Sequence, residues 1–277
     1  MNLAFSTNAY KKTTLEAAID SIAAIGYTGV ELMADIPHAY PPDMPPDRIA
    51  RIRTQLARHK LALSNVNAFT LFAQGDTYHP TWIENDPALI QQRITHTQNA
   101  IRMTAAINNN QPATISLQPG GPLGSIPRDV ALTRYEEGLR ACLPLAQQLN
   151  ITLMVEPEPG LLIQYSHECT DFLAHVNHPN LKMNCDLGHF YCVGEDPAAV
   201  LRTCAPHIAH IHLEDIPESR VHQHHIPGDG AMDWPAIFSA IRDIYYKGWI
   251  TVELYPYETT AEQAAQKAFA YLQPFLK

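Results

Sequence analysis

The chain has 277 residues, a net charge of −9 and 46% hydrophobic residues. This content excludes an intrinsically disordered chain, and the acidic balance argues against a nucleic-acid or anionic-membrane partner held by bulk charge. No apolar run approaches the roughly 20 residues of a membrane helix, and the first residues lack the regions of a signal peptide. Five cysteines without a C-x-x-C pair favour buried, reduced thiols, so we expect a cytoplasmic protein.

Short apolar runs alternate with helical periods along the chain. In chain order they predict a strand at 2–7, a helix from Leu15 to a cap at Gly26, a strand at 29–34, a helix at 45–59, a strand at 61–67, a helix at 86–108, a strand at 113–118, a helix at 128–150, a strand at 151–156, a helix at 167–175, a strand at 181–186, a helix at 197–204, a strand at 208–213, a helix at 233–246, a strand at 249–254 and a helix at 260–276.

These elements form eight strand–helix pairs, which predict a single (β/α)₈ TIM barrel over residues 1–277 with no second domain. No G-x-G-x-x-G follows the first strand, which argues against a dinucleotide-binding Rossmann domain. The irregular stretch 69–85 is long for a connection and carries Phe69, Phe72, Tyr78 and Trp82. We therefore predict that it is a lid or a substrate loop.

Metal-capable side chains stand at the ends of the last four predicted strands: Glu156, Asp186, His212 and Glu253. Active sites of such barrels lie where the carboxyl ends of the strands meet, and four converging polar groups indicate a shared cation. Three carboxylates and one imidazole favour one Mn²⁺ or Mg²⁺ ion, with Co²⁺, Fe²⁺ and Zn²⁺ as alternatives. The cysteine spacing does not support a structural zinc site.

The run from Glu156 through Asp186-Leu-Gly-His189, His210-Ile-His212-Leu-Glu-Asp and Gly-Asp-Gly to Glu253 resembles the xylose isomerase-like TIM-barrel superfamily. That group includes sugar and sugar-phosphate isomerases and epimerases, hydroxypyruvate isomerase, inosose dehydratase and endonuclease IV. The resemblance is dense over residues 150–256 and covers only the architecture elsewhere. It is specific for the superfamily and poorly specific for the substrate.

This resemblance implies that Glu156, Asp186, His212 and Glu253 bind one divalent metal. It also implies that Glu156 and Glu253 act as acid and base on a metal-stabilised cis-enediolate of a small sugar, sugar phosphate or keto-polyol. His189 would contact the substrate oxygens. Glu158 is a further candidate substrate contact, or a ligand in place of Glu156. The expected activity is that of a sugar isomerase or epimerase, and the expected assembly is a homodimer or a homotetramer.

The endonuclease branch of the superfamily has metal-binding histidines at the ends of strands 3 and 4, where this chain has Asn67 and Gln118. These amides are better suited to sugar hydroxyls. His222 and His224 keep part of the nuclease pattern, and we interpret them as substrate or phosphate contacts, a second metal site or a solvated loop. An inosose-type dehydratase, a nuclease and a catalytically silent metabolite-binding barrel remain the alternative functions.

Four further polar residues carry weaker expectations. Because His210 alternates with His212 along the strand, we expect its side chain to point to the opposite face, toward the helices, as a structural histidine. Asp215 is expected to orient the following loop, and Asp233 to cap the helix that starts there. His38 is a candidate substrate contact from the loops after the early strands.

Overall fold

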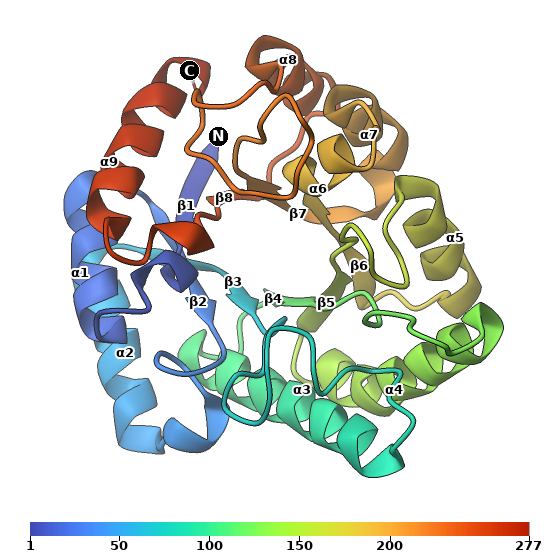
Figure 1. Ribbon diagram of the computed structural model, residues 1–277. Helices are drawn as coiled ribbons and strands as arrows, with labels where there is room; N and C mark the ends of the chain where they lie inside the picture. Colours follow the sequence, from blue (N-terminus) through green and yellow to red (C-terminus); the bar gives the residue numbers. More distant parts are fainter. Residues whose placement is uncertain (277) are drawn as a thin grey trace.

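The computed structural model describes residues 1–276 and forms a closed barrel of eight parallel strands, ringed by helices (Figure 1). The strands follow one another around the barrel in chain order, and β8 pairs with β1 to close it. Their bounds are β1 Asn2–Ser6, β2 Gly29–Met33, β3 Ala62–Asn67, β4 Ala113–Leu117, β5 Ile151–Val155, β6 Leu181–Asp186, β7 Ile208–Leu213 and β8 Trp249–Val252. The predicted single barrel is confirmed.

The helices surround the strands, and their apolar faces are buried against them. Their bounds are α1 Leu15–Ile25, α2 Pro46–His59, α3 Pro87–Ile107, α4 Arg128–Gln148, α5 Ser166–Val176, α6 Leu187–Cys192, α7 Pro197–Cys204, α8 Trp234–Asp243 and α9 Ala261–Leu272. The predicted ends of two helices are confirmed. Gly26 closes α1 at a φ of 114°, which favours glycine, and the Asp233 carboxylate caps α8 by accepting from the Ala236 amide at 3.0 Å.

The sequence does not predict α6, because this helix has only six residues and starts directly after β6. Its first turn is capped by Asp186, whose Oδ1 accepts from the backbone N–H of His189 at 2.9 Å. One side chain thus ends the strand, caps the helix and points into the barrel mouth. The short helix fixes the position of His189 relative to Asp186.

Part of the stretch 69–85 belongs to the core and not to a lid. The Trp82 side chain is fully buried, with its ring centroid 5.7 Å from that of Tyr135 on α4. Phe69, Phe72 and Tyr78 instead line the pocket at the barrel mouth. The segment therefore contributes a pocket wall from its first half and a core anchor from its second.

Candidate metal centre and active site

The four residues predicted as metal ligands lie at one end of the barrel. Glu156 directly follows β5, Asp186 ends β6, His212 lies in β7 and Glu253 directly follows β8. One ligand atom from each lies within 4.8 Å of the others, and all four side chains are buried. Asp186 and His212 are also register partners on neighbouring strands. The fold thus gathers three carboxylates and one imidazole around one point.

The imidazole of His212 faces the three carboxylates with its Nδ1 atom. This atom is 2.8 Å from Glu156 Oε1, 3.8 Å from Asp186 Oδ2 and 3.9 Å from Glu253 Oε2. Burial opposes a charge on the ring, but the carboxylates of Glu31, Glu156 and Glu253 outweigh it and raise the pKa of His212 well above its ordinary value. The cluster is strongly negative, and this ring is its one cationic partner among the four.

Two carboxylate oxygens of the cluster, Glu156 Oε2 and Asp186 Oδ2, are buried without a hydrogen-bond partner in residues 1–276. An unpaired buried anion is costly, so these oxygens require a cation or a donor that arrives with a ligand. Carboxylate oxygens with one imidazole nitrogen are a donor set for a divalent ion such as Mn²⁺ or Mg²⁺. The residues present therefore fit a divalent metal ion.

Glu31 lies behind His212 and was not found from the sequence. Its Oε2 lies 2.6 Å from His212 Nε2 and accepts from the Asn65 side chain at 2.8 Å. Burial opposes the charge on Glu31, but the positive field of His212 outweighs it and holds the pKa of Glu31 below its usual range. When an ion takes the place of the Nδ1 proton, a hydrogen bond from Nε2 to Glu31 would direct the Nδ1 lone pair toward the carboxylate cluster. The only sequence signal is an acidic residue in the middle of an apolar strand.

Two amides, one just after β1 and one at the end of β3, hold Glu253. Asn8 donates to Glu253 Oε1 at 2.8 Å and Asn67 donates to the same oxygen at 3.0 Å. Asn67 Oδ1 in turn accepts from the backbone of Phe69 at 3.0 Å. Burial raises the pKa of Glu253, and the nearby charge of Glu156 raises it further. Asn67 thus lies in the pocket as a partner of Glu253.

Three histidines form one side of the pocket. His189 Nδ1 lies 2.9 Å from the carbonyl of Pro157, and its ring centroid is 4.6 Å from that of His222. His222 Nε2 lies 3.2 Å from His224 Nε2, and His224 Nδ1 lies 2.9 Å from the carbonyl of Glu253. Burial lowers the pKa of His222 to about 3 and that of His224 to about 4. These two rings are neutral donors and acceptors at the site.

Glu158 stands between the histidines and the segment after β3. Its Oε1 accepts from the Tyr78 hydroxyl at 2.8 Å and lies 3.8 Å from His222 Nδ1. Burial raises the pKa of Glu158 to about 7, with a smaller contribution from the charge of Glu156. Glu158 is therefore placed to accept or donate a hydrogen bond near neutral pH. It is not one of the four converging residues around His212.

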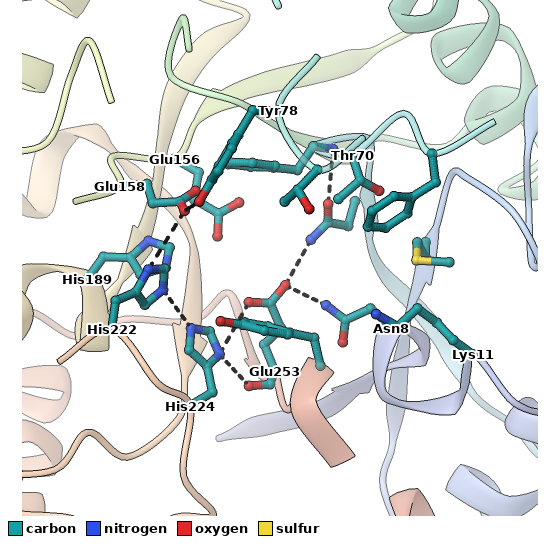
Figure 2. Close-up of a pocket in the computed structure, with 16 residues that line it drawn as sticks. Asn8, Lys11, Thr70, Tyr78, Glu156, Glu158, His189, His222, His224 and Glu253 are labelled. Atoms are coloured by element: carbon teal, nitrogen blue, oxygen red, sulfur yellow. Dashed lines mark hydrogen bonds and ion pairs between the residues drawn. The ribbon is translucent and has the colours of Figure 1, made fainter. Parts of the chain in front are cut away.

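The pocket has a volume of about 480 Å³, and Glu156 and Glu253 of the cluster lie in its lining (Figure 2). Its lining includes Asn8, Asn67, Glu156, Glu158, His189, His222, His224 and Glu253. Gln118 is absent from the residues that line it. The Gln118 amide is fully buried and donates to the carbonyl of Tyr78 at 2.9 Å. The structure thus places this predicted contact behind the pocket wall.

Two other expectations are wrong. His210 lies inside the barrel, with Nε2 2.8 Å from Thr251 Oγ1 and 3.9 Å from Glu31 Oε2. The reason is that residues two apart on a strand share a face, so His210 and His212 point the same way. His38 is buried outside the pocket lining and faces the carbonyls of Tyr10 and Thr13.

Asp215 fixes the loop that carries His222 and His224, as the sequence predicts. Its buried carboxylate accepts from the backbone N–H groups of Gly228 at 2.8 Å and Met232 at 3.1 Å, and from the Trp234 indole at 3.1 Å. A side chain at Gly230 would collide with this carboxylate, which explains the glycine. The neighbouring Glu214 carboxylate is buried against Asp186, and burial raises its pKa.

Comparison with known proteins extends these observations. An inosose dehydratase of Lacticaseibacillus casei is 23% identical over 95% of this chain and 90% of its own length. A fructoselysine 3-epimerase of Shigella flexneri is 24% identical over 92% of this chain and 90% of its own length. The crystal structure of a D-tagatose 3-epimerase-like protein superposes with a TM-score of 0.84 at 18% identity, covering 100% of this chain and 97% of that one.

The family model described as xylose isomerase-like TIM barrel matches residues 19–275, which is most of the chain. The match includes β5 to β8 and all four residues of the carboxylate–imidazole cluster. The closed eight-stranded barrel has the architecture that this description names. This chain belongs to the xylose isomerase-like TIM-barrel family.

Proposed function

We propose that this protein is a divalent-metal-dependent epimerase or isomerase of a small keto-sugar or related polyol. One observation carries the proposal: Glu156 and Glu253 both contribute an oxygen to the same four-residue donor set. They enter the pocket from different sides (Figure 2). Two carboxylates on different sides of a bound sugar can remove a proton and return one. The epimerase and dehydratase names of the relatives support a sugar-like substrate.

Glu156, Asp186, His212 and Glu253 would hold the ion, with Mn²⁺ or Mg²⁺ favoured and Co²⁺, Fe²⁺ or Zn²⁺ as alternatives. When bound, the ion supplies Lewis-acid polarisation of a carbonyl, which makes the neighbouring C–H more acidic. Glu31 orients the His212 ring from behind, through the 2.6 Å contact at Nε2. The chain thus provides both the ligands and the group that orients one of them.

The two glutamates divide the proton transfer. Asn8 and Asn67 hold the carboxylate of Glu253 in one orientation, from which it can exchange a proton with a bound substrate. One glutamate takes the proton from the carbon beside the carbonyl, and the other returns a proton. Return to the same carbon gives the epimer, whereas return to the neighbouring carbon gives the isomer.

The other polar residues of the pocket would contact the substrate. We assign this role to His189, His222, His224 and Glu158, which line the pocket beside the cluster. Asn67 lies in the same lining, and its amide is shared with Glu253. Gln118 would act only indirectly, by holding the Tyr78 carbonyl. Sugar hydroxyls both donate and accept, which suits neutral imidazoles and a glutamate that titrates near neutral pH.

A dehydratase is the second candidate, and the inosose dehydratase relatives favour it. It would begin with the same proton removal and then expel water instead of returning the proton. A nuclease is a weaker candidate, because Asn67 and Gln118 stand at the ends of β3 and β4, with their amides bonded within the protein. A silent metabolite-binding barrel would bind the ion without turnover.

The test is incubation of the Mn²⁺-loaded protein with a panel of keto-sugars and keto-polyols in D₂O. An epimerase or isomerase gives a product of unchanged composition that carries deuterium at the reacting carbon, whereas a dehydratase gives a product lighter by one water. Glu253→Gln should lower turnover by at least about 10³-fold, and Glu137→Gln at an exposed position on α4 is the matched control. Full activity in Glu253→Gln would refute the proposal.

The proposed cellular setting is the cytoplasm, with a small sugar or related polyol as the partner and neither nucleic acid nor a membrane. All five cysteines are free thiols, which agrees with a reducing compartment. No helix within residues 1–276 combines the length and apolar content needed to span a bilayer. Measurement of the mass in solution would decide between a monomer, a homodimer and a homotetramer.

A further inference from the structure

One wall of the pocket is made by a segment without helix or strand. Residues 69–80, between β3 and α3, contribute Phe69, Thr70, Phe72, Thr77 and Tyr78 to the pocket lining. The Tyr78 side chain points from this wall toward Glu158 (Figure 2). Loops of this kind are commonly mobile, so what holds this one decides the shape of the pocket.

Asp35 holds the middle of the segment. This residue lies just after β2, is fully buried and is not part of the pocket lining. Its carboxylate accepts from the Thr70 hydroxyl at 2.8 Å, the Phe72 backbone N–H at 2.5 Å and the Ala73 backbone N–H at 3.1 Å. Three donors from four consecutive residues thus converge on one buried anion. Hydrogen bonds to a charged acceptor are stronger than neutral ones, so this is a firm anchor.

Arg93 holds both ends of the segment. This side chain projects from α3, is fully buried and likewise does not line the pocket. Its Nη1 donates to the carbonyl of Phe69 at 2.9 Å and to that of Ala68 at 3.3 Å, while its Nε donates to the carbonyl of Pro80 at 2.8 Å. Burial of a guanidinium whose hydrogen bonds go to neutral backbone carbonyls costs free energy, so these three bonds must offset that cost. The planar guanidinium contacts both ends of the segment at once, whereas a lysine ammonium would hold them less completely.

Tyr78, near the end of the segment, contacts a polar residue of the pocket. Gln118 donates to the Tyr78 carbonyl, and the Tyr78 hydroxyl donates to Glu158. The phenyl ring of Phe72 lies beside the Lys11 ammonium, 5.6 Å from the ring centroid. A shift of the segment would therefore move side chains on both sides of the pocket. It would leave the four-residue carboxylate–imidazole cluster in place.

We propose that Asp35 and Arg93 are positioning residues that hold segment 69–80 as a preformed wall and thereby set substrate affinity and selectivity. The effect on turnover rests on the proposed function. Where the wall is held, the binding-competent shape is already populated. Where it is released, the apparent affinity falls with the fraction of molecules in that shape. Release should raise KM and leave kcat nearly unchanged, because the groups that move protons are untouched.

The first measurement is hydrogen–deuterium exchange of the full-length, Mn²⁺-loaded protein. Asp35→Asn and Arg93→Met should speed exchange in peptides covering residues 69–80 by about tenfold or more, with β5 to β8 unchanged. Arg93→Lys should restore part of the protection. The controls are Asp43→Asn, an exposed acid, and Arg102→Met, an exposed arginine on the same helix as Arg93. Unchanged exchange in 69–80, or faster exchange everywhere, would overturn the inference.

The second measurement is steady-state kinetics with the best substrate from the panel and with a bulkier analogue. Asp35→Asn and Arg93→Met should each raise KM by about tenfold and leave kcat within about twofold of the wild type. The ratio of kcat/KM between the two substrates should become smaller. A fall in kcat at constant KM would overturn the inference. If the wild type turns over none of the panel, the proposed function fails, and the exchange measurement alone decides whether Asp35 and Arg93 hold the wall.

Discussion

The buried carboxylates of this barrel fall into two groups, according to the hydrogen bonds that their oxygens accept. Asp35 and Asp215 accept several backbone N–H groups and position loops. Glu156 and Asp186 each leave a buried oxygen without a partner in the described chain. The first kind is explained by the loops that these residues hold. The second kind fits a cation, which supports the candidate site independently of any resemblance.

The sequence predicts the residues of the cluster but not their supporting partners. Glu156, Asp186, His212 and Glu253 end successive strands, so chain order alone brings them together. Glu31 reaches His212 from across the barrel, and that contact depends on strand tilt and register, which spacing does not reveal. Gln118 likewise follows a strand directly, but its amide donates to the carbonyl of Tyr78, in a segment whose position the sequence does not predict.

His96 on α3 provides a test at the scale of one residue. Its ring is 3% exposed, both nitrogens lack partners in the described chain, and it stacks on Tyr40 at 6.2 Å. Burial lowers the pKa of His96 from 6.5 to about 3, and the charge of Arg93 adds to this. The unfolded chain therefore takes up the proton first. The contribution of neutral His96 to the free energy of unfolding is therefore fully present above pH 6.5, and it declines as the pH falls toward 3.

Replacement of His96 by Phe should remove this loss, because Phe keeps the stack and has nothing to protonate. In urea unfolding, the wild type should lose about 2 kcal/mol more than His96→Phe between neutral pH and about pH 5. His167→Phe, at an exposed position, is the control. Parallel pH profiles for the wild type and His96→Phe would show that His96 is not the neutral buried group described above.

At the scale of elements, periodicity identifies strands and long helices and fails where one residue serves two elements. Asp186 ends β6 and caps α6, so the sequence has no turn residues between the two elements that would predict the start of a helix. Trp82 shows the second kind of failure. An aromatic in an irregular stretch has the same sequence signature in a pocket wall and in a core, and only packing against Tyr135 decides between them.

The loop between β7 and α8 provides a test at this scale. Asp215→Ala would leave the N–H groups of Gly228 and Met232 and the Trp234 indole without their acceptor. We expect a loss of about 3 kcal/mol in the free energy of unfolding, measured by urea titration. Glu218→Gln, exposed in the same loop, should change stability by less than about 0.5 kcal/mol. An equal effect of the two substitutions would contradict the anchoring role of Asp215.

At the scale of the whole molecule, the barrel converts chain order into proximity. Eight parallel strands close in sequence order, so residues from position 8 to position 253 meet at one end. The early strands supply amides that hold Glu253, and the late strands supply the carboxylate–imidazole cluster. The order of strands and the cluster could be predicted from the sequence. The sequence also points to the segment after β3 as a substrate loop. The groups that anchor this segment, the hydrogen bonds of Asn8 and Asn67 to Glu253 and the acid behind His212 could not be predicted, because they arise from contacts between distant parts of the chain.

The central claim is that Glu156, Asp186, His212 and Glu253 hold one divalent ion. Calorimetric titration of the metal-free protein with Mn²⁺ tests it most directly. We predict one ion per chain, with binding weakened by at least about 100-fold in Asp186→Asn and unchanged in Glu137→Gln. Absence of binding in the wild type, or stoichiometric binding that survives Asp186→Asn, would contradict it.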